Sequence, residues 1–434
     1  MTGKWRDLTF SEAVFINPPV RLERGCHYPF VDMGAVSPGF RYAYANEERK
    51  FSGSGSRFQH GDVLMARITP CLENGKIARF CASESSQVAH GSTEFIVIRG
   101  RPSVTHTDFA YYLTLWGEVR GYAISHMTGT SGRQRVPTDS FDHLTVPIPP
   151  LPEQRAIAHI LGTLDDKIEL NRRMSETLEQ MARALFKAWF VDFEPVRAKM
   201  EGRWRRGESL PGLPAHLYDL FPDRLVDSEL GEIPEGWRVG TLGDVADHIR
   251  RNVQPSQIEP QTPYIALEHM PRRCIALSDW GAAEGIESNK FEFRKGEILF
   301  GKLRPYFHKV GVAPVDGVCS TDIVVVAPKT PHWFAFVLYV VSGDEFVEYT
   351  NAGSTGTKMP RTSWVEMARY DIVLPSDAIA QAFTEMVRPE VDRIIAATHE
   401  SRTLAALRDT LLPKLISGAL RVKDAERFLR ECGL

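Results

Sequence analysis

Basic side chains stand directly after strand-like motifs and glycine-rich loops at several points of this chain. They are Arg67, Arg133, Arg135, Lys302, Arg304, Lys358 and Arg361. The glycines of the two loops are Gly129, Gly132, Gly353 and Gly356. Arginine suits bidentate hydrogen bonding to guanine, whereas lysine and the main-chain amides of a glycine loop suit phosphates. We therefore take these residues as candidate DNA contacts, with ordinary surface charges and plain turn glycines as the alternatives.

Two further motifs could suggest methyl transfer. Asn17-Pro18-Pro19-Val20 is similar to the Asn-Pro-Pro-aromatic signature with which amino-methyltransferases hold a flipped adenine, and Phe51–Gly55 fits a Phe-x-Gly-x-Gly loop for S-adenosylmethionine. Val20 replaces the aromatic ring that would stack on the base, a contact worth about 1–3 kcal/mol. The glycine loop follows the charged segment 46–50, where a nucleotide site at a helix N-terminus would need an apolar strand. Self-contained methyl transfer is therefore disfavoured.

No other motif in the sequence indicates catalysis. There is no Walker A sequence, no His-Glu-x-x-His zinc motif and no Gly-x-Ser-x-Gly nucleophile elbow. Nothing fixes carboxylates such as Asp62 and Glu73 in a nuclease arrangement, and Asp62 and Glu297, each beside a glycine, fit a turn before a strand better. The pattern is typical of a protein that recognises a ligand.

The candidate contacts occur in pairs because the chain contains two copies of one domain. The segment from Phe58 to Pro70 matches the segment from Phe293 to Pro305, and the correspondence continues as far as Pro149 and Pro375. A repeat this long is a duplicated domain, since solenoid units have about 20–50 residues. The sequence therefore predicts two similar binding surfaces related by a pseudo-twofold axis.

The elements that must position these residues form a mixed α/β (α+β) fold. Short β-branched and aromatic runs separated by Gly, Pro and Ser turns indicate strand-rich domains at 1–150 and 237–375. The predicted helices within them are Phe109–Val119 and Trp333–Val341, and the predicted closing strands are 144–149 and 370–375. A linker at 201–236 and a C-terminal tail at 421–434 complete the chain.

Each domain is followed by a segment with the apolar period of a helix, at 151–200 and 376–420. The apolar residues expected to pack or to bind a partner are Ile157, Leu161, Leu164, Ile168, Leu178, Leu185, Ile394, Leu404, Leu411 and Leu415. A continuous helix from Glu153 to Phe190 would be about 57 Å long, too long for one small domain to cover. We therefore expect an antiparallel coiled-coil pair that separates the two domains.

Three residues interrupt these apolar stripes. Gly162 and Pro389 stand at nearly corresponding places, and Pro413 lies near the end of the second stripe. A proline inside a helix costs about 3 kcal/mol or more and usually marks a kink. At Gly162 and Pro389 the alternative is that each helix has a short first segment and then restarts. In the linker, the run Arg203–Arg206 is either a nucleic-acid patch or a solvated loop, and charge runs favour the loop.

Length, net charge and cysteine content limit the classes of protein to which this chain can belong. The 434 residues suggest about three domains, and the net charge is −3. The segment Lys290–Lys309 nevertheless carries six basic residues against two glutamates, which keeps nucleic-acid binding open because a local patch decides it. The six cysteines lack metal-ligand spacing and are expected to be reduced thiols. The polar start and the lack of a long apolar run predict a cytoplasmic protein with no membrane span.

Several segments together resemble the specificity subunit of type I restriction-modification systems. They are the repeated strand motif with its following basic residue and proline, the loop 129–132, Pro149–Ile157, Ser228–Trp237 and Leu411–Gly418. The resemblance covers nearly the whole chain. One departure is that Ala378–Gln381 stands where the first copy has Pro152–Arg155, which leaves the start of the second long helix open.

The resemblance implies a division of labour. Two target-recognition domains would each recognise one half of a split sequence in double-stranded DNA, with the two long helices setting the spacing. Two modification subunits would bring S-adenosylmethionine and methylate one adenine in each half-site. Restriction subunits would add translocation and cleavage with ATP and Mg²⁺, and the chain itself would bind no cofactor and have no catalytic residue.

The repeat supports DNA recognition independently. Major-groove faces recur about every 34–36 Å, so two similar domains on a rigid spacer can contact two half-sites. Two alternatives stay open: a DNA methyltransferase or nuclease that acts alone, and a helical scaffold that recruits proteins and does not bind DNA.

Overall fold

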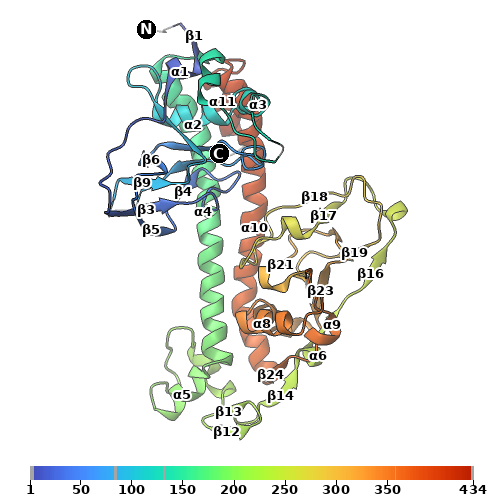
Figure 1. Ribbon diagram of the computed structural model, residues 1–434. Helices are drawn as coiled ribbons and strands as arrows, with labels where there is room; N and C mark the ends of the chain where they lie inside the picture. Colours follow the sequence, from blue (N-terminus) through green and yellow to red (C-terminus); the bar gives the residue numbers. More distant parts are fainter. Residues whose placement is uncertain (1–3, 83–85, 131, 357, 432–434) are drawn as a thin grey trace. The chain divides into compact units, whose positions relative to one another are not determined.

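The structure, a computed structural model, describes residues 4–82, 86–130, 132–356 and 358–431 (Figure 1). It divides into two compact units, Met1–Leu170 with Thr403–Leu434, and Asn171–Arg402. Each unit contains one strand-rich domain and part of each long helix, α4 (Leu151–Phe190) and α10 (Asp377–Ile416). The predicted fold class, two tandem mixed α/β domains with two long helices, is confirmed.

The domain of the first unit is built on two sheets. Their strands, in sheet order, are β2 (Val14–Ile16), β10 (Phe95–Gly100), β7 (Val63–Ala66), β8 (Ile77–Phe80) and β4 (Tyr42–Ala43) in one sheet, and β5 (Glu47–Lys50), β3 (His27–Val31), β9 (Val88–Gly91) and β6 (Ser56–Gln59) in the other. Side chains alternate between two cores. In β7, Leu64 lies in the core between the sheets, whereas Val63 and Met65 lie in the core shared with the helices. Outside these sheets, β1 (Arg6–Thr9) pairs with β11 (Thr145–Ile148), as the predicted closing strand requires.

The single helix predicted at Phe109–Val119 was wrong, because two helices occupy this region. They are α2 (Thr107–Leu115) and α3 (Gly117–Ser125), and they meet at Trp116, whose ψ of 134° is extended. The apolar pattern runs across this residue without a break. A turn of the backbone at one position therefore leaves no mark on the periodicity.

The domain of the second unit repeats this arrangement. Its strands, in sheet order, are β15 (Ala246–His248), β23 (Ile323–Pro328), β20 (Ile298–Gly301) and β21 (Val310–Val312) in one sheet, and β16 (Arg251–Val253), β19 (Lys290–Phe293), β22 (Gly317–Cys319), β17 (Pro263–Ile265) and β18 (Gly281–Ala282) in the other. In β20, Leu299 faces the core between the sheets and Ile298 and Phe300 face the helical core, as in β7. The predicted helix is α7 (Phe334–Val341), which α8 (Asp344–Ala352) follows. The predicted closing strand is β24 (Asp371–Leu374), which pairs with β14 (Arg238–Thr241).

The two domains differ at the sheet edge that β6 forms in the first domain. In the second domain β16 pairs with β19, so β19 has a neighbour on both sides. In the first domain β6 is the counterpart of β19, and among the described residues it pairs with β9 alone. The duplication is therefore faithful in the core and unequal at this edge.

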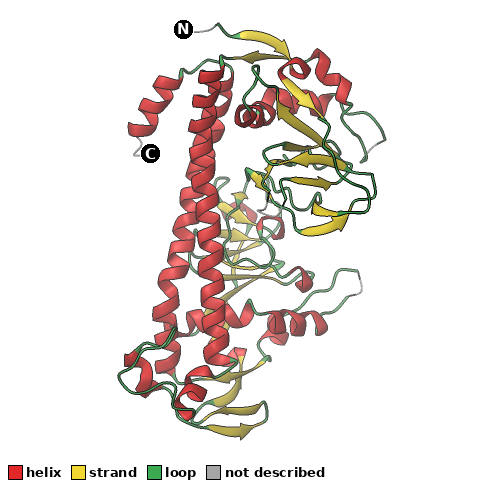
Figure 2. Cartoon of the chain, turned by 90° about the vertical axis from the view of Figure 1, so that its left-hand side faces the viewer, coloured by secondary structure: helices red, strands yellow, loops and turns green. Residues whose placement is uncertain are grey.

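The long helices α4 and α10 are each continuous over 40 residues (Figure 2). Asp165 of α4 contacts Arg408 of α10 in the first unit, and Asn171 contacts Glu400 in the second. Because the partner number falls as the number along α4 rises, the helices run antiparallel, as predicted. Eight of the ten chosen apolar residues are buried: Ile157, Leu161, Leu164, Ile168, Leu404, Leu411 and Leu415 in the first unit and Ile394 in the second. Leu178 and Leu185 are partly buried against the second core.

The alternative of a restart at Gly162 and Pro389 is wrong, since neither helix is interrupted there, and α10 also continues through Pro413. At Gly162 the reason for glycine is a close neighbour. A Cβ there would lie 3.0 Å from Arg41 Nη1, and this atom donates to the Gly162 carbonyl at 3.3 Å. Around Pro389, burial of Val387, Val391 and Ile394 offsets the lost hydrogen bond and keeps the helix whole.

Gln154, the last residue of the Pro-Pro-Leu-Pro-Glu-Gln segment, joins the first domain to α4. Its hydrogen bonds explain the structural role of that segment. Its buried Nε2 donates to Val104 O (2.8 Å) and Pro149 O (2.7 Å), and its Oε1 accepts from the His106 N–H (2.7 Å). In the second copy Ala380 is buried at the corresponding position, and α10 begins at Asp377. The departure from the first copy therefore removes this joint without preventing the helix start.

The linker is an ordered part of the second unit. It follows α5 (Glu194–Met200), a short helix in the segment 151–200 after the end of α4, and it contains the hairpin of β12 (Leu225–Ser228) and β13 (Gly231–Pro234). Trp204 is buried and donates to Glu208 O at 2.9 Å, and Arg203 forms an ion pair with Glu194 at 2.6 Å. Internal contacts therefore occupy much of the Arg203–Arg206 run. Among the described residues, no helix has both the length and the apolar composition that a membrane crossing requires.

Candidate nucleic-acid interface

Three segments of the first domain meet at Arg67, directly after β7. The Arg67 N–H donates to Glu94 O at 2.9 Å, and the Arg67 carbonyl accepts from the Val136 N–H at 2.9 Å. The glycine loop ends beside them, where Thr128 and Arg135 exchange both peptide hydrogen bonds at 3.0 and 2.9 Å. We call Arg67, Glu94, Arg133 and Arg135 the first strand-end cluster.

The second domain builds the same arrangement after β20. The Lys302 N–H donates to Asp322 O at 2.9 Å, and the Lys302 carbonyl accepts from the Thr362 N–H at 3.1 Å. Thr355 and Arg361 exchange their peptide hydrogen bonds at 3.0 and 2.9 Å. We call Lys302, Arg304, Asp322 and Arg361 the second strand-end cluster. In each domain the structure therefore brings together residues that the sequence analysis selected from separate motifs.

One arginine in each cluster is held by a carboxylate. Arg135 Nη2 lies 2.7 Å from Glu94 Oε1, with Nε within 3.0 Å of both oxygens, and Arg361 Nε lies 3.1 Å from Asp322 Oδ1. Hydrogen bonding to Glu94 raises the pKa of Arg135, so its charge is fixed. Neither carboxylate was selected from the sequence. These ion pairs hold the glycine loop against the turn before β10 or β23, so both arginines have a positioning role beside any contact with DNA.

The other selected cations form no ion pair with any residue that the structure describes. They are Arg67, Arg133, Lys302, Arg304 and Lys358. Arg133 and Lys358 are exposed on their loops. Arg67 is partly buried, its Nη2 donates to Val136 O at 3.1 Å, and its Nε is buried with no hydrogen-bond partner. Uncompensated cations at the ends of strands and on loops suit phosphate or base contacts.

Three of the four selected glycines have conformations that need glycine. Gly129, Gly132 and Gly356 have φ of 125°, 78° and 98°. Gly353 follows α8 with φ of −80°, and a Cβ there would lie 2.8 Å from Glu366 Oε1. Ser131 and Thr357, within the two loops, lie outside the described residues. The turn alternative therefore accounts for these glycines without a ligand, and their contact with DNA stays a prediction.

The basic segment Lys290–Lys309 is less available than its composition suggests. Lys290 is buried and donates to Ser288, and Lys309 donates to Leu267 O, and burial lowers the pKa of both amines. His248 lies near Lys302. Burial is the main cause that lowers the pKa of His248 to about 4, and the charges of Arg250 and Lys302 lower it further. A neutral imidazole near Lys302 avoids a second positive charge.

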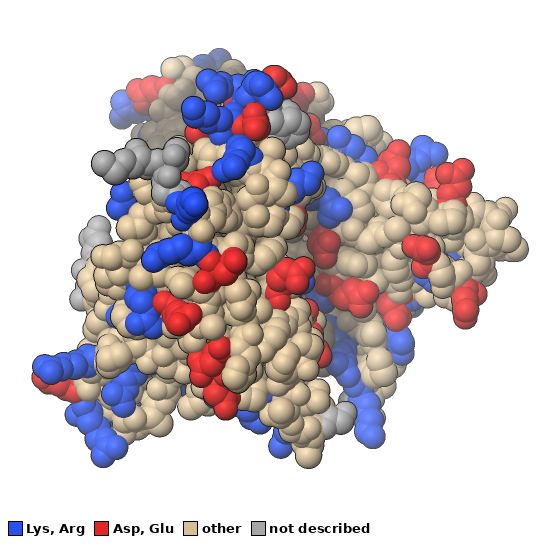
Figure 3. Space-filling view, turned by 90° about the horizontal axis from the view of Figure 1, so that it is seen from above, with Lys and Arg blue, Asp and Glu red and all other residues tan. Residues whose placement is uncertain are grey.

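Charges of both signs are mixed on the surface seen in Figure 3. Lysines and arginines stand among aspartates and glutamates over this face, as the net charge of −3 leads one to expect. A local cluster, and not a broad basic surface on this face, must therefore carry any affinity for DNA.

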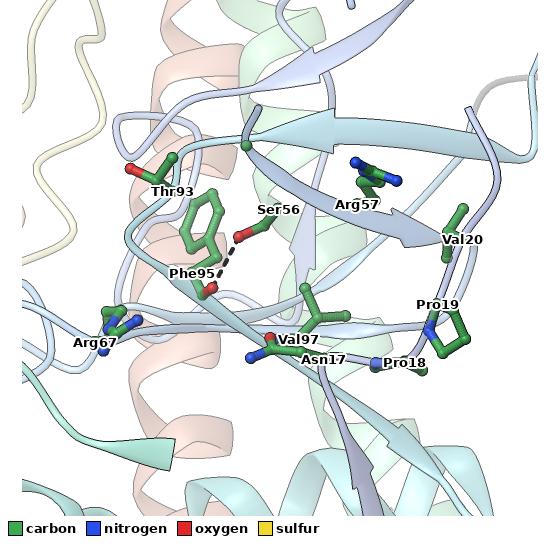
Figure 4. Close-up of a pocket in the computed structure, with 11 residues that line it drawn as sticks. Asn17, Pro18, Pro19, Val20, Ser56, Arg57, Arg67, Thr93, Phe95 and Val97 are labelled. Atoms are coloured by element: carbon green, nitrogen blue, oxygen red, sulfur yellow. Dashed lines mark hydrogen bonds between the residues drawn. The ribbon is translucent and has the colours of Figure 1, made fainter. Parts of the chain in front are cut away.

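A pocket of about 390 Å³ lies in the first domain beside the strand-end cluster (Figure 4). Its eleven lining residues are Asn17, Pro18, Pro19, Val20, Gly55, Ser56, Arg57, Arg67, Thr93, Phe95 and Val97. The two motifs that suggested methyl transfer are thus neighbours in space, since Asn17–Val20 comes from one and Gly55 from the other. They form no strand-turn-helix, so the objection to a stand-alone methyltransferase stands.

An aromatic group beside the second cluster was not predicted from the sequence. Tyr306 is 51% exposed, and its ring meets that of Phe307 edge-on with centroids 4.7 Å apart. The Arg272 guanidinium lies 4.1 Å from the centre of the Phe307 ring. Arg304 and His308 flank this turn with φ of 52° and 50°, a conformation that costs free energy in residues other than glycine. Two aromatic residues after the proline of a basic segment were the available signal.

Comparison with known proteins gives these features a context. A family model described as the type I restriction modification DNA specificity domain matches residues 26–180. The specificity subunit of the type I restriction enzyme MjaIX from Methanocaldococcus jannaschii is 26% identical over 334 residues, covering 73% of this chain and 70% of the relative. That of the enzyme HindI from Haemophilus influenzae is 24% identical over 437 residues, covering 90% and 94%.

A solved structure has a similar fold. The type I restriction-modification system S subunit from M. genitalium aligns over 95% of this chain and 96% of its own length, with a TM-score of 0.53 and 14% sequence identity. The matched domain, the relatives that align over most of the chain, and the repeated domain with its long helices agree with one another. The chain is thus similar, over most of its length, to type I restriction enzyme specificity subunits, and residues 26–180 match their DNA specificity domain.

Proposed function

We propose that this chain is the DNA-binding subunit that sets the target sequence of a type I restriction-modification complex. Each strand-rich domain contacts one half of a bipartite target. The observation that carries the proposal is the strand-end cluster, which each domain builds with the same peptide hydrogen bonds and provides with unpaired cations. Two such clusters on one chain suit a target in two parts.

The two half-sites differ in sequence under this proposal. Arg67 of the first cluster corresponds to Lys302 of the second. Arg304 of the second cluster corresponds to Thr69 in the first copy. Arginine can donate two parallel hydrogen bonds to guanine, whereas lysine acts as a point charge. The frames are alike and the contacting side chains are unlike, so the two domains would recognise different bases.

The long helices would set the number of base pairs between the half-sites. The helices α4 and α10 are continuous over 40 residues, and their paired faces are buried. Major-groove faces recur about every 34–36 Å, so a stiff connection favours one separation of the half-sites. Side chains on the outer helix faces would be available to partner subunits.

Catalysis would belong to partner subunits. Two modification subunits would supply S-adenosylmethionine and methylate adenine, and restriction subunits would supply the ATP- and Mg²⁺-dependent steps. The chain would bind none of these cofactors, act in the cytoplasm and have no catalytic residue of its own.

Mapping methylated adenines tests this function. The chain is produced in cells with its modification subunit, and genomic DNA is sequenced with detection of N6-methyladenine. We expect one methylated adenine in each half of a split sequence with a fixed spacer. A continuous target, or methylation that does not depend on the chain, would overturn the proposal.

The purified chain alone separates the remaining alternatives. It should bind duplex DNA with an affinity that falls as salt rises, because phosphate contacts release counterions. Methyl transfer from S-adenosylmethionine, or cleavage with Mg²⁺, in the absence of any partner would favour an enzyme that acts alone. The lack of any salt-sensitive affinity for duplex DNA would favour a protein scaffold.

A further inference from the structure

Two prolines, Pro18 and Pro19, leave β6 as an edge strand among the described residues of the first domain. After β15, Ile249 donates its N–H to Val325 O at 2.9 Å, and the chain then continues into β16, which pairs with β19. After β2, Asn17 donates its N–H to Val97 O at 2.7 Å, but Pro18 and Pro19 follow. Proline has no N–H for a ladder, so this segment cannot cover β6 as β16 covers β19.

The pocket described above occupies the side of β6 that faces this segment (Figure 4). Its walls are fixed by local bonds. Asn17 has φ of 49°, and its Oδ1 accepts from the Val97 N–H at 2.9 Å, so both its peptide and its side chain bind β10. Ser56 Oγ donates to Phe95 O at 2.9 Å, and Gly55, with φ of 99°, leaves no space for a Cβ beside Gly91 O.

The charge of the pocket is positive and uncompensated. Arg57 and Arg67 are the charged residues among the eleven that line it, and no aspartate or glutamate is included. Neither guanidinium has an ion-pair partner among the described residues. Arg57 Nη2 instead donates to Gly53 O at 3.2 Å, with the guanidinium 4.9 Å from the centre of the Phe51 ring. In the second domain the corresponding segment is neutralised, since Arg251 pairs with Glu297 at 2.7 Å.

The geometry points to this pocket as a binding site for a phosphate ester, with Arg57 and Arg67 as its cationic ligands. Guanidinium groups bind phosphate oxygens through charge-assisted hydrogen bonds, and both arginines line the pocket without a carboxylate among its lining residues. The phosphate can come from the DNA backbone or from a free nucleotide. Because Arg67 also belongs to the first strand-end cluster, the backbone source rests on the proposed function.

The site is a property of the first domain alone. Pairing of β16 with β19 fills the corresponding edge of the second domain. The first domain therefore makes a phosphate contact that the second does not, and the two halves of the target contribute unequally to the dependence of affinity on salt.

The substitution Arg57→Gln tests the pocket, because Arg57 is exposed and its removal leaves the fold intact. The full chain, assembled with its modification subunits, is titrated with a duplex that carries the mapped target at several NaCl concentrations. We expect the slope of log K against log salt to fall in magnitude by about one, with the methylated sequence unchanged. Arg57→Lys should restore most of the slope, since lysine also binds phosphate.

Two further variants control the result. Arg6→Gln removes another exposed arginine of the same domain, outside the pocket, and it should leave the slope unchanged. Arg67→Gln should lower the magnitude of the salt slope as Arg57→Gln does, with thermal unfolding measured because this change also removes the bond to Val136 O. Only the salt slope of this variant is compared, because Arg67 also belongs to the first strand-end cluster. An equal effect of all three variants would overturn the inference, because net charge alone would then explain the loss.

A second arm uses deoxyadenosine monophosphate as the probe. If it binds the wild-type chain and not Arg57→Gln while the DNA slope is unaltered, the pocket holds a phosphate ester from a free nucleotide. If neither probe responds to Arg57→Gln, the inference is overturned. A change in the methylated bases would also overturn it, because the ligand would then be a base edge. Wild-type protein that binds no duplex would contradict the proposed function, whatever the probe does at the pocket.

Discussion

Asp165 of α4 and Arg408 of α10 form a buried ion pair. Arg408 Nη1 lies 2.6 Å from Asp165 Oδ1, and the two side chains are only 8% and 1% exposed. The hydroxyl of Tyr112, on α2, donates to Asp165 Oδ2 at 2.7 Å, and Arg408 Nη1 also donates to Gly39 O at 3.2 Å. Burial raises the pKa of Asp165, and the charge of Arg408 opposes that shift. The pair therefore joins both helices to the first domain at one register.

Breaking this pair should destabilise the first unit strongly. Arg408→Met leaves Asp165 buried without its counterion, so we expect a loss of about 3–5 kcal/mol in the free energy of unfolding. Combining it with Asp165→Leu removes the stranded charge and should recover most of the loss. Urea unfolding of the full chain measures both. The exposed pair Arg206–Asp219 is the control, and Arg206→Ala should cost less than about 1 kcal/mol.

Aspartate substitutions along the helices should have effects that follow burial. Leu404 is 2% exposed, so Leu404→Asp should cost more than about 3 kcal/mol through lost packing and a buried charge. Leu178 is partly buried, and Leu178→Asp should cost less. Leu170 lies on the same helix as Leu178 and is 58% exposed, so Leu170→Asp should change stability by less than about 0.5 kcal/mol. Equal losses at the three positions, by thermal or urea unfolding, would contradict the described helix packing.

Arg133 and Arg135 should respond differently to alanine. Arg133 is exposed, and Arg133→Ala should weaken DNA binding without a loss of stability. If Arg133 contacts a base, discrimination at one position should fall by about 1–3 kcal/mol, whereas a phosphate contact should lower affinity uniformly and reduce the salt slope by about one. Arg135→Ala removes the bond to Glu94 and should also lower the melting temperature. Competition assays with single-base variants of the target distinguish the two roles.

Exchange of residues 1–150 for the same region of another specificity subunit should alter one half of the methylated sequence. The second strand-end cluster consists entirely of residues of the second unit, so its half-site should be retained. Methylation mapping of the hybrid measures this directly. A change in both halves would show that the domains do not recognise their half-sites independently.

His248 should make the second unit sensitive to acid. Its pKa is lowered from 6.5 to about 4, chiefly by burial, so the folded protein favours the neutral ring. The unfolded chain binds a proton more readily below pH 6.5, and stability should therefore fall as pH is lowered from about 6.5 towards about 4. The loss should be smaller than the full shift implies, since solvent reaches part of the ring. His248→Phe should flatten this dependence in unfolding curves recorded over that range, and an unchanged curve would exclude His248 as its source.

Some of this architecture follows from sequence periodicity. The repeat placed β7 and β20 in equivalent positions, and apolar steps of three and four placed α4 and α10, because both signals are local. Interruptions were less reliable. Gly162 suggested a restart but accommodates Arg41, a residue 121 positions away in the chain. Packing against a distant side chain leaves no local pattern that could reveal this.

The candidate interface shows the same limit. Arg67, Arg135 and their counterparts were selected from their own motifs, but the partners Glu94 and Asp322 were not. Hydrogen bonds between the backbones of three separate segments bring these residues together. The pocket was missed because it depends on a strand pairing that the second domain makes and the first does not. Tertiary pairing, and not residue type, determines which cations remain free.

The loop closed by Thr128 and Arg135 has a consequence for the evolution of this chain. Its two ends are joined by paired peptide hydrogen bonds, and Glu94 secures one of them. Mutations at the exposed positions between those ends, such as Thr130 and Arg133, do not disturb the core. Under the proposed function, point mutations at these exposed positions would change the preferred target of one domain while its scaffold is inherited intact, and a lineage facing new invading DNA would not need a new fold.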